Sequence, residues 1–162
     1  MGFLKGIFGG NGVITISAPC AGRLKALRDV KDPTFSAEIL GQGVAIVPFD
    51  GKFYAPADGI VATVFPTGHA AAMKTAGDAD VLLHIGLDTV KLNGKYFTIY
   101  VEEGQRVKKG DPLLEPDLEA IRKAGYDLTT PVVICNSDAF DKITTSGTEE
   151  VAVGDEILRL TR

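Results

Sequence analysis

The fold is decided between residues 61 and 85, which read VATVFPTGHAAAMKTAGDADVLLHI. Apolar and β-branched residues are frequent at both ends of this stretch, as is typical of strands. The sequence Thr75-Ala76-Gly77-Asp78 between them is typical of a tight turn. The pattern predicts an antiparallel hairpin with its strands at residues 61–73 and 80–85.

The protein has only two histidines, His69 and His84, and both lie in this hairpin. In a hairpin centred on Ala76 and Gly77, the numbers of two opposed residues add up to 153. The numbers of His69 and His84 also add up to 153, so the two histidines are predicted to be opposed. Opposed side chains point to one face with Cβ atoms about 4.5–5.5 Å apart, so we expect both imidazoles to reach one small anion or one metal ion.

Each of these residues also has a structural interpretation. A lone histidine in a strand is usually a hydrogen-bonded or half-exposed polar side chain, but the pairing of His69 with His84 favours a site. Thr67 lies two residues before His69 and is expected on the same strand face. Its hydroxyl group is suited to bind an imidazole nitrogen or a phosphoryl oxygen, although threonine is also an ordinary strand residue.

Outward from the hairpin, the composition indicates one mainly β domain. The chain has 162 residues, 19 glycines and eight prolines, which favours many short strands joined by tight turns. The first clear strand is expected at residues 13–17. Helical signals are limited to a short segment between Asp117 and Gly125 and a turn near Ser137. We therefore predict an antiparallel β-sandwich or barrel with short helices.

The net charge of −4 provides no general attraction for nucleic acid. Cys20 and Cys135 are far apart and form no CxxC pair, which favours a reducing cytoplasm. No apolar run approaches the roughly 20 residues that a membrane span requires. Residues 1–12 are expected to form a flexible N-terminal tail, with at most a weak membrane-surface contact, and residues 13–162 to form the folded domain.

Two other classes of protein compete for these patterns. The Ala72-Met73-Lys74-Thr75 sequence resembles the hairpin at which biotin is attached, but carrier domains place their Gly-Gln phrase before the lysine, whereas Gly104-Gln105 follows Lys74 here. A self-sufficient zinc enzyme would need three protein ligands, and only two histidines exist. A metal site formed by His69, His84 and a carboxylate of a partner protein stays open.

Two signatures carry a family resemblance: FPTGHA at residues 65–70 and LLHIGLDTV at residues 82–90. Six further stretches support them, namely SAPCAG (17–22), VKDPTF (30–35), GQGVAI (41–46), YAPADG (54–59), EGQRV (103–107) and TPVVI (130–134). In this order and without large gaps, they resemble the glucose-family enzyme IIA of the bacterial sugar phosphotransferase system over about residues 14–160.

The resemblance implies a cytoplasmic phosphotransferase component without a cofactor. It accepts a phosphoryl group from the histidine-containing phosphocarrier protein and passes it to a cysteine of the enzyme IIB domain of a glucose-type sugar permease. His84 matches the phosphorylated histidine, and His69 and Thr67 match its partners. Regulatory target proteins are implied as further partners. The matching docking positions, an apolar surface ringed by acidic groups, are Asp32, Phe35, Ile39, Leu40, Phe65, Asp88 and Val90.

The residues themselves are chemically consistent with such a relay. A histidine with a pKa near 6.5 is mostly neutral in the cytoplasm and has a lone pair that can attack phosphorus. Phosphoryl transfer needs mainly positioning and charge stabilisation, which we expect from His69, Thr67 and backbone N–H groups near Gly86. The sequence has no Walker loop, so ATP is not expected to be the direct donor.

Overall fold

A computed structural model describes residues 12–162 of the chain. The predicted tail and its membrane contact therefore lie outside the described residues, apart from Gly12. No helix in the described part is long and apolar enough to cross a bilayer.

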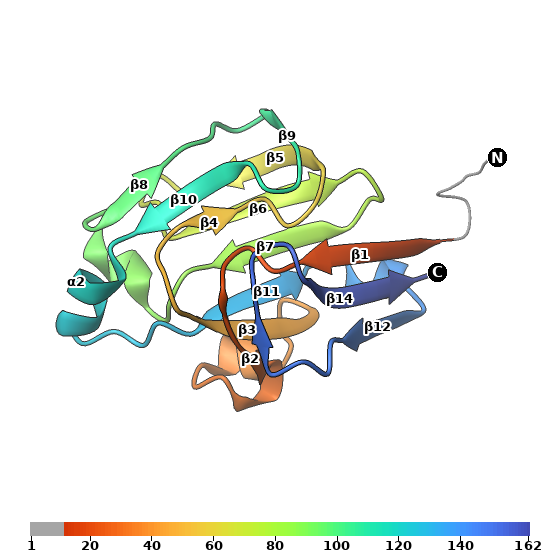
Figure 1. The fold of residues 1–162 in the computed structure, drawn as a ribbon, viewed down its shortest axis with the longest axis horizontal. Coiled ribbons are helices and arrows are strands. Elements are labelled where there is room, and N and C mark those ends of the chain that lie inside the picture. The colour runs from red at the N-terminus through yellow and green to blue at the C-terminus, as the bar shows by residue number, and fades with distance from the viewer. Residues whose placement is uncertain (1–11) are drawn as a thin grey trace.

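The architecture is three antiparallel sheets with very little helix, which confirms the predicted fold class (Figure 1). The large sheet has the strand order β13 (Glu150–Val151), β2 (Gly22–Ala26), β3 (Gln42–Pro48), β11 (Thr130–Ile134), β7 (Asp80–His84), β6 (Ala70–Thr75), β5 (Gly59–Val64), β9 (Arg106–Val107). The two smaller sheets have the orders β1 (Val13–Ser17), β14 (Glu156–Thr161), β12 (Lys142–Thr145) and β4 (Phe53–Tyr54), β10 (Pro112–Pro116), β8 (Phe97–Ile99).

The helical elements are short. They are α1 (Pro33–Ser36), α2 (Leu118–Lys123) and the 3₁₀ turns η1 (Leu27–Asp29), η2 (Thr89–Leu92) and η3 (Ser137–Ala139). The predicted strand at residues 13–17 and the predicted helical segments after Asp117 and near Ser137 are all present. Asp117 caps α2 by accepting a hydrogen bond from the Ala120 N–H at 3.1 Å. The helix α1 was not predicted, because four residues are too few to show a helical period.

The large sheet is covered on both faces, and this arrangement positions the histidines. On one face, alternate residues of β3 such as Val44 and Ile46 join the main core, together with residues of the two smaller sheets such as Leu114. On the other face, Ala45 joins a second buried cluster that contains Leu27 of η1 and Phe35 of α1. This smaller cluster is the support on which the region around His84 is built.

The hairpin prediction needs two corrections. Residues 61–73 are not one strand, because the chain turns at residues 65–69 and forms β5 and β6, which pair with each other. The β6–β7 register pairs Ala70 with His84 and Met73 with Val81, so the numbers of opposed residues add up to 154 and not 153. The turn is off-centre because Thr75 and Ala79 close it and Asp78 adopts a left-handed conformation (φ 67°).

The close approach of β3 and β11 depends on Gly43. A Cβ atom at this position would lie 2.0 Å from the Val132 carbonyl oxygen, so the two backbones would have to separate. We expect Gly43→Ala to lower the free energy of unfolding by about 1–3 kcal/mol, the usual range for overpacking. Urea denaturation would measure this difference.

Gly147→Ala is the matched control, because a Cβ atom there meets no heavy atom within 4 Å. Its free energy of unfolding should stay within about 0.5 kcal/mol of the parent. Equal stability of the Gly43→Ala protein and the parent would show that the β3–β11 contact is not as tight as described.

Candidate active site

The two imidazoles lie together, although not as opposed residues of a hairpin. His84 is the last residue of β7, and His69 precedes β6. The Ile85 N–H donates to the His69 carbonyl oxygen at 2.7 Å, which holds the two chain segments side by side. The ring centroids are 5.0 Å apart at an interplanar angle of 83°. The predicted proximity is therefore present, one residue out of the predicted register.

A hydrogen bond to the backbone orients the His84 ring. Its Nδ1 lies 2.8 Å from the Gly86 carbonyl oxygen, and a carbonyl oxygen only accepts hydrogen bonds. Nδ1 therefore carries the proton, and the lone pair of the neutral ring is at Nε2. The His84 residue is half-buried.

The turn after His84 is fixed from several sides. Gly86 has a left-handed conformation (φ 75°), and a Cβ atom there would lie 2.7 Å from Thr89 Cγ2. The buried Thr89 hydroxyl donates to the Ile85 carbonyl oxygen at 2.5 Å, and the Leu87 N–H donates to the Asp127 carbonyl oxygen at 3.0 Å. Together these contacts fix the direction of the Gly86 carbonyl group.

The same contacts correct the expectation for backbone N–H groups near Gly86. The Gly86 N–H points at the Thr130 hydroxyl at 3.4 Å, and the Leu87 N–H is bound to Asp127. Both N–H groups are directed into the protein and are not available to a phosphoryl group.

His69 is the more buried of the two histidines, with 3% of its surface exposed. Its Nδ1 lies 2.6 Å from the Thr67 hydroxyl oxygen. The predicted contact between these residues is therefore present, although it forms within the turn between β5 and β6 and not along a strand face. Burial, and to a smaller extent the neighbouring His84, lowers the pKa of His69 from 6.5 to about 4.

His84 is also neutral near pH 7. Burial lowers the pKa of His84 below its ordinary value, while the Gly86 carbonyl group, Asp32 and Asp88 oppose that shift. The two rings are so close that a positive charge on one would disfavour a positive charge on the other. Within residues 12–162, no carboxylate forms an ion pair with either ring. The site thus holds two neutral imidazoles, and the lone pair of the His84 ring is at Nε2.

Most residues of the predicted docking surface are exposed. Ile39 is 69% exposed, and Leu40, Phe65 and Val90 are exposed as well. Phe35 differs from the prediction, since only 4% of it is exposed. Its ring packs against His84, with centroids 5.0 Å apart, because α1 directs it into the buried cluster below the site. Phe35 supports the His84 ring and is not part of the exposed patch.

The two predicted acidic residues also have structural roles. Asp32 caps α1 by accepting a hydrogen bond from the Thr34 N–H at 3.0 Å. Asp88 is exposed and adopts a left-handed conformation (φ 60°) at the start of η2. Both carboxylates act electrostatically on His84, so the site has a negative rim close to a neutral centre.

The structure favours the histidine site over the two alternatives, a self-sufficient metal site and a biotinyl lysine. Within residues 12–162, no group of three or more potential metal ligands comes together, so the histidine pair lacks a third protein ligand. Lys74 lies inside β6 and not at the tip of a hairpin, and its ammonium group is 2.6 Å from Asp80. This position is unlike the exposed turn at which a biotinyl lysine would be expected.

Comparisons with known proteins agree with the site. Residues 14–140 match the family described as phosphoenolpyruvate-dependent sugar phosphotransferase system, EIIA 1. A glucose-specific EIIA component of Bacillus cereus is 41% identical over 148 residues, which are 91% of this chain and 90% of that protein. A β-glucoside-specific EIIBCA component of Dickeya chrysanthemi is 49% identical over 140 residues, 86% of this chain but 21% of that protein.

The chain spans about a fifth of the length of the β-glucoside-specific relatives that it matches. Among solved structures, the glucose permease IIA of Mycoplasma capricolum superposes with a TM-score of 0.84 at 34% identity, covering 94% of this chain and 99% of that one. The family match, the full-length similarity to glucose-specific EIIA components and the shared fold show that the chain belongs to the EIIA 1 family of the phosphoenolpyruvate-dependent sugar phosphotransferase system.

Proposed function

We propose that the protein is a phosphohistidine relay in sugar uptake. Nε2 of His84 accepts a phosphoryl group from the histidine-containing phosphocarrier protein and donates it to a cysteine of an enzyme IIB domain. The observation that carries the proposal is the 2.8 Å contact between His84 Nδ1 and the Gly86 carbonyl oxygen, which leaves the lone pair at Nε2. Family membership supports the reaction class.

Each half-reaction exchanges one bond to phosphorus. In the first, the lone pair of His84 Nε2 forms a P–N bond while the P–N bond of the donor phosphohistidine breaks and returns its electron pair to the donor ring. In the second, a thiolate of the IIB domain forms an S–P bond while the His84 P–N bond breaks. No external acid or base is required, because His84 starts and ends each cycle as a neutral ring.

His69 is suited to stabilise the charge of the moving group. When the Thr67 hydroxyl donates to Nδ1 of His69 across the 2.6 Å contact, the proton of the neutral His69 ring resides on Nε2. That N–H can donate to a phosphoryl oxygen on His84. The low pKa of His69, about 4, keeps the ring neutral and avoids a permanent charge that would hold the phosphoryl group too tightly.

The partners would dock on the exposed apolar side chains of Ile39, Leu40, Phe65 and Val90. The negative rim formed by Asp32 and Asp88 would steer partners that carry basic residues at the matching position. The named relatives suggest a glucose-type or β-glucoside-type permease as the owner of the IIB domain. We expect the same surface to serve regulatory target proteins, and we place the reaction in the cytoplasm, where no nucleic acid or bound cofactor takes part.

The direct test is phosphorylation by phosphoenolpyruvate, enzyme I and the phosphocarrier protein, followed by intact-mass measurement and assignment of the modified residue. We expect one phosphoryl group, on His84, and none on the His84→Gln protein, because no other side chain of the site has a free nucleophilic lone pair at that position. Circular dichroism would verify that this variant is folded. Full phosphorylation of folded His84→Gln would refute the assignment.

A second experiment separates the roles of the histidines. In His69→Gln an amide keeps a donor of similar reach, so His84 should still become phosphorylated, whereas transfer to the IIB domain should slow by about 10²–10³, as for the loss of one donor to a developing charge. Rapid-quench measurement of both half-reactions gives the two rates. Transfer at the parental rate would mean that His69 takes no part in the chemistry.

A further inference from the structure

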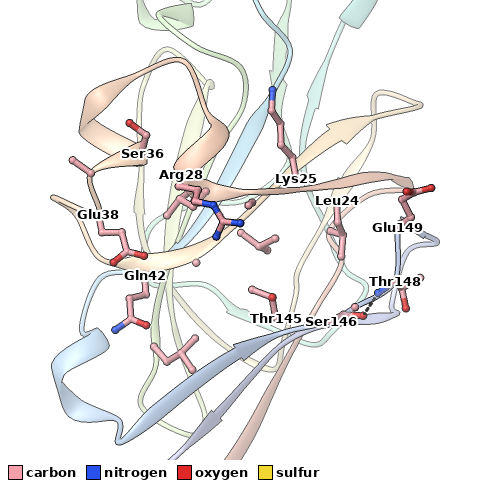
Figure 2. A pocket seen from close by; sticks show the side chains of 17 residues that line it. Leu24, Lys25, Arg28, Ser36, Glu38, Gln42, Thr145, Ser146, Thr148 and Glu149 are labelled. Atoms are coloured by element: carbon pink, nitrogen blue, oxygen red, sulfur yellow. Dashed lines mark hydrogen bonds between the residues drawn. The ribbon is translucent and has the colours of Figure 1, made fainter.

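One groove of the described structure lies apart from the two histidines and is lined by neither of them. It has a volume of about 620 Å³ and is lined by residues 24–28, 36–38, 42–44, 143 and 145–149. Its floor comes from the start of β3 and the end of β2, and its walls come from the segment after α1 and from the connection between β12 and β13. Figure 2 shows Arg28 over the middle of this groove, with Glu38 and Gln42 at one end and Ser146 and Thr148 at the other.

Arg28 supplies a positive charge without a partner. Within residues 12–162, no carboxylate lies within 4.0 Å of its guanidinium group, and this group makes no hydrogen bond to the protein. An arginine is charged at every physiological pH and presents a planar fork that matches two oxygens of a phosphate group. The hydroxyl groups of Thr145 and Thr148 lie in the same groove and can bind to the same anion.

The rest of the lining is unsuited to a bare or highly charged anion. Glu38 and Glu149 both line the groove, and carboxylates repel a ligand made of phosphate groups alone. Glu38 and Gln42 can instead bind hydroxyl groups, which donate to a carboxylate and exchange hydrogen bonds with an amide. The side chains of Leu24 and Ile143 provide apolar surface between these polar groups, as is usual in small-molecule sites.

We propose that this groove binds a phosphorylated sugar. Arg28 would take the phosphate group, Glu38 and Gln42 would take the sugar hydroxyl groups, and the apolar floor would contact the carbon face of the ring. A free phosphate ion would leave Glu38 and Gln42 without a ligand, and an uncharged sugar would leave Arg28 unpaired. Both should therefore bind more weakly than the combined ligand.

The groove is connected to the histidine site through shared elements. Leu27 lines the groove and belongs to the buried cluster that contains Phe35, and the Phe35 ring lies 5.0 Å from His84. Residues 36–38, which form a wall of the groove, follow Phe35 directly. A bound ligand would therefore be sensed at His84. This regulatory role rests on the proposed function. The sugar phosphate formed during uptake would then regulate the phosphoryl transfer that leads to its formation.

The test is a titration of the unphosphorylated protein with glucose 6-phosphate, followed by NMR, with inorganic phosphate and glucose in separate arms. We expect saturable one-to-one binding, shifts of the groove residues and of the His84 ring signals, and Kd values at least about tenfold higher for the two separate components. Arg28→Gln should raise the Kd for glucose 6-phosphate at least about tenfold, the effect of losing one charge-assisted contact.

Arg23→Gln is the matched control, because Arg23 is also exposed and lies on β2 but pairs with Glu150 at 3.1 Å outside the groove. It should leave the Kd unchanged. Absence of saturable binding, equal binding of inorganic phosphate, or an unchanged Kd in Arg28→Gln would overturn the proposal. The titration needs no phosphoryl donor, so its failure is distinguishable from a failure of His84 to become phosphorylated.

Discussion

The hydrogen bond between His84 Nδ1 and the Gly86 carbonyl oxygen is the contact on which the site depends. It fixes the tautomer of the ring and thereby decides which nitrogen carries the lone pair. The contact exists because Gly86 adopts a left-handed conformation that a larger residue would adopt only with strain and with a clash against Thr89. The chain therefore uses one glycine, two residues after the end of β7, to orient the ring of a strand histidine with its lone pair at Nε2.

The surroundings of the pair balance two opposing electrostatic effects. Burial disfavours charge on both rings, while Asp32, Asp88 and the Gly86 carbonyl group favour it at His84 only. In the proposed relay, this difference would suit His84 to carry the phosphoryl group and His69 to act as a neutral hydrogen-bond donor. His84 is half-buried, and the exposed Phe65 ring lies beside His69, so a docked partner would exclude water from the site.

Sequence reasoning predicted the β architecture, the strand at residues 13–17, the Asp117-capped helix and the meeting of the two histidines. It misplaced the register by one residue, because the length of a turn depends on a left-handed residue, Asp78, that has no strong local signal. It placed Phe35 on the surface, because only the tertiary packing of α1 against the sheet decides which way that ring points. The inward directions of the Gly86 and Leu87 N–H groups likewise depend on Thr130 and Asp127, which lie far along the chain.

The most direct test of the proposed role of His84 is to identify the phosphorylated nitrogen. Heteronuclear NMR of the phosphorylated, ¹⁵N-labelled protein would show which ring nitrogen of His84 is coupled to phosphorus. We expect phosphorus to be coupled to Nε2, with Nδ1 still protonated and hydrogen-bonded to the Gly86 carbonyl group. Coupling of phosphorus to Nδ1 would contradict this expectation, because that nitrogen could react only after its hydrogen bond to Gly86 had been broken.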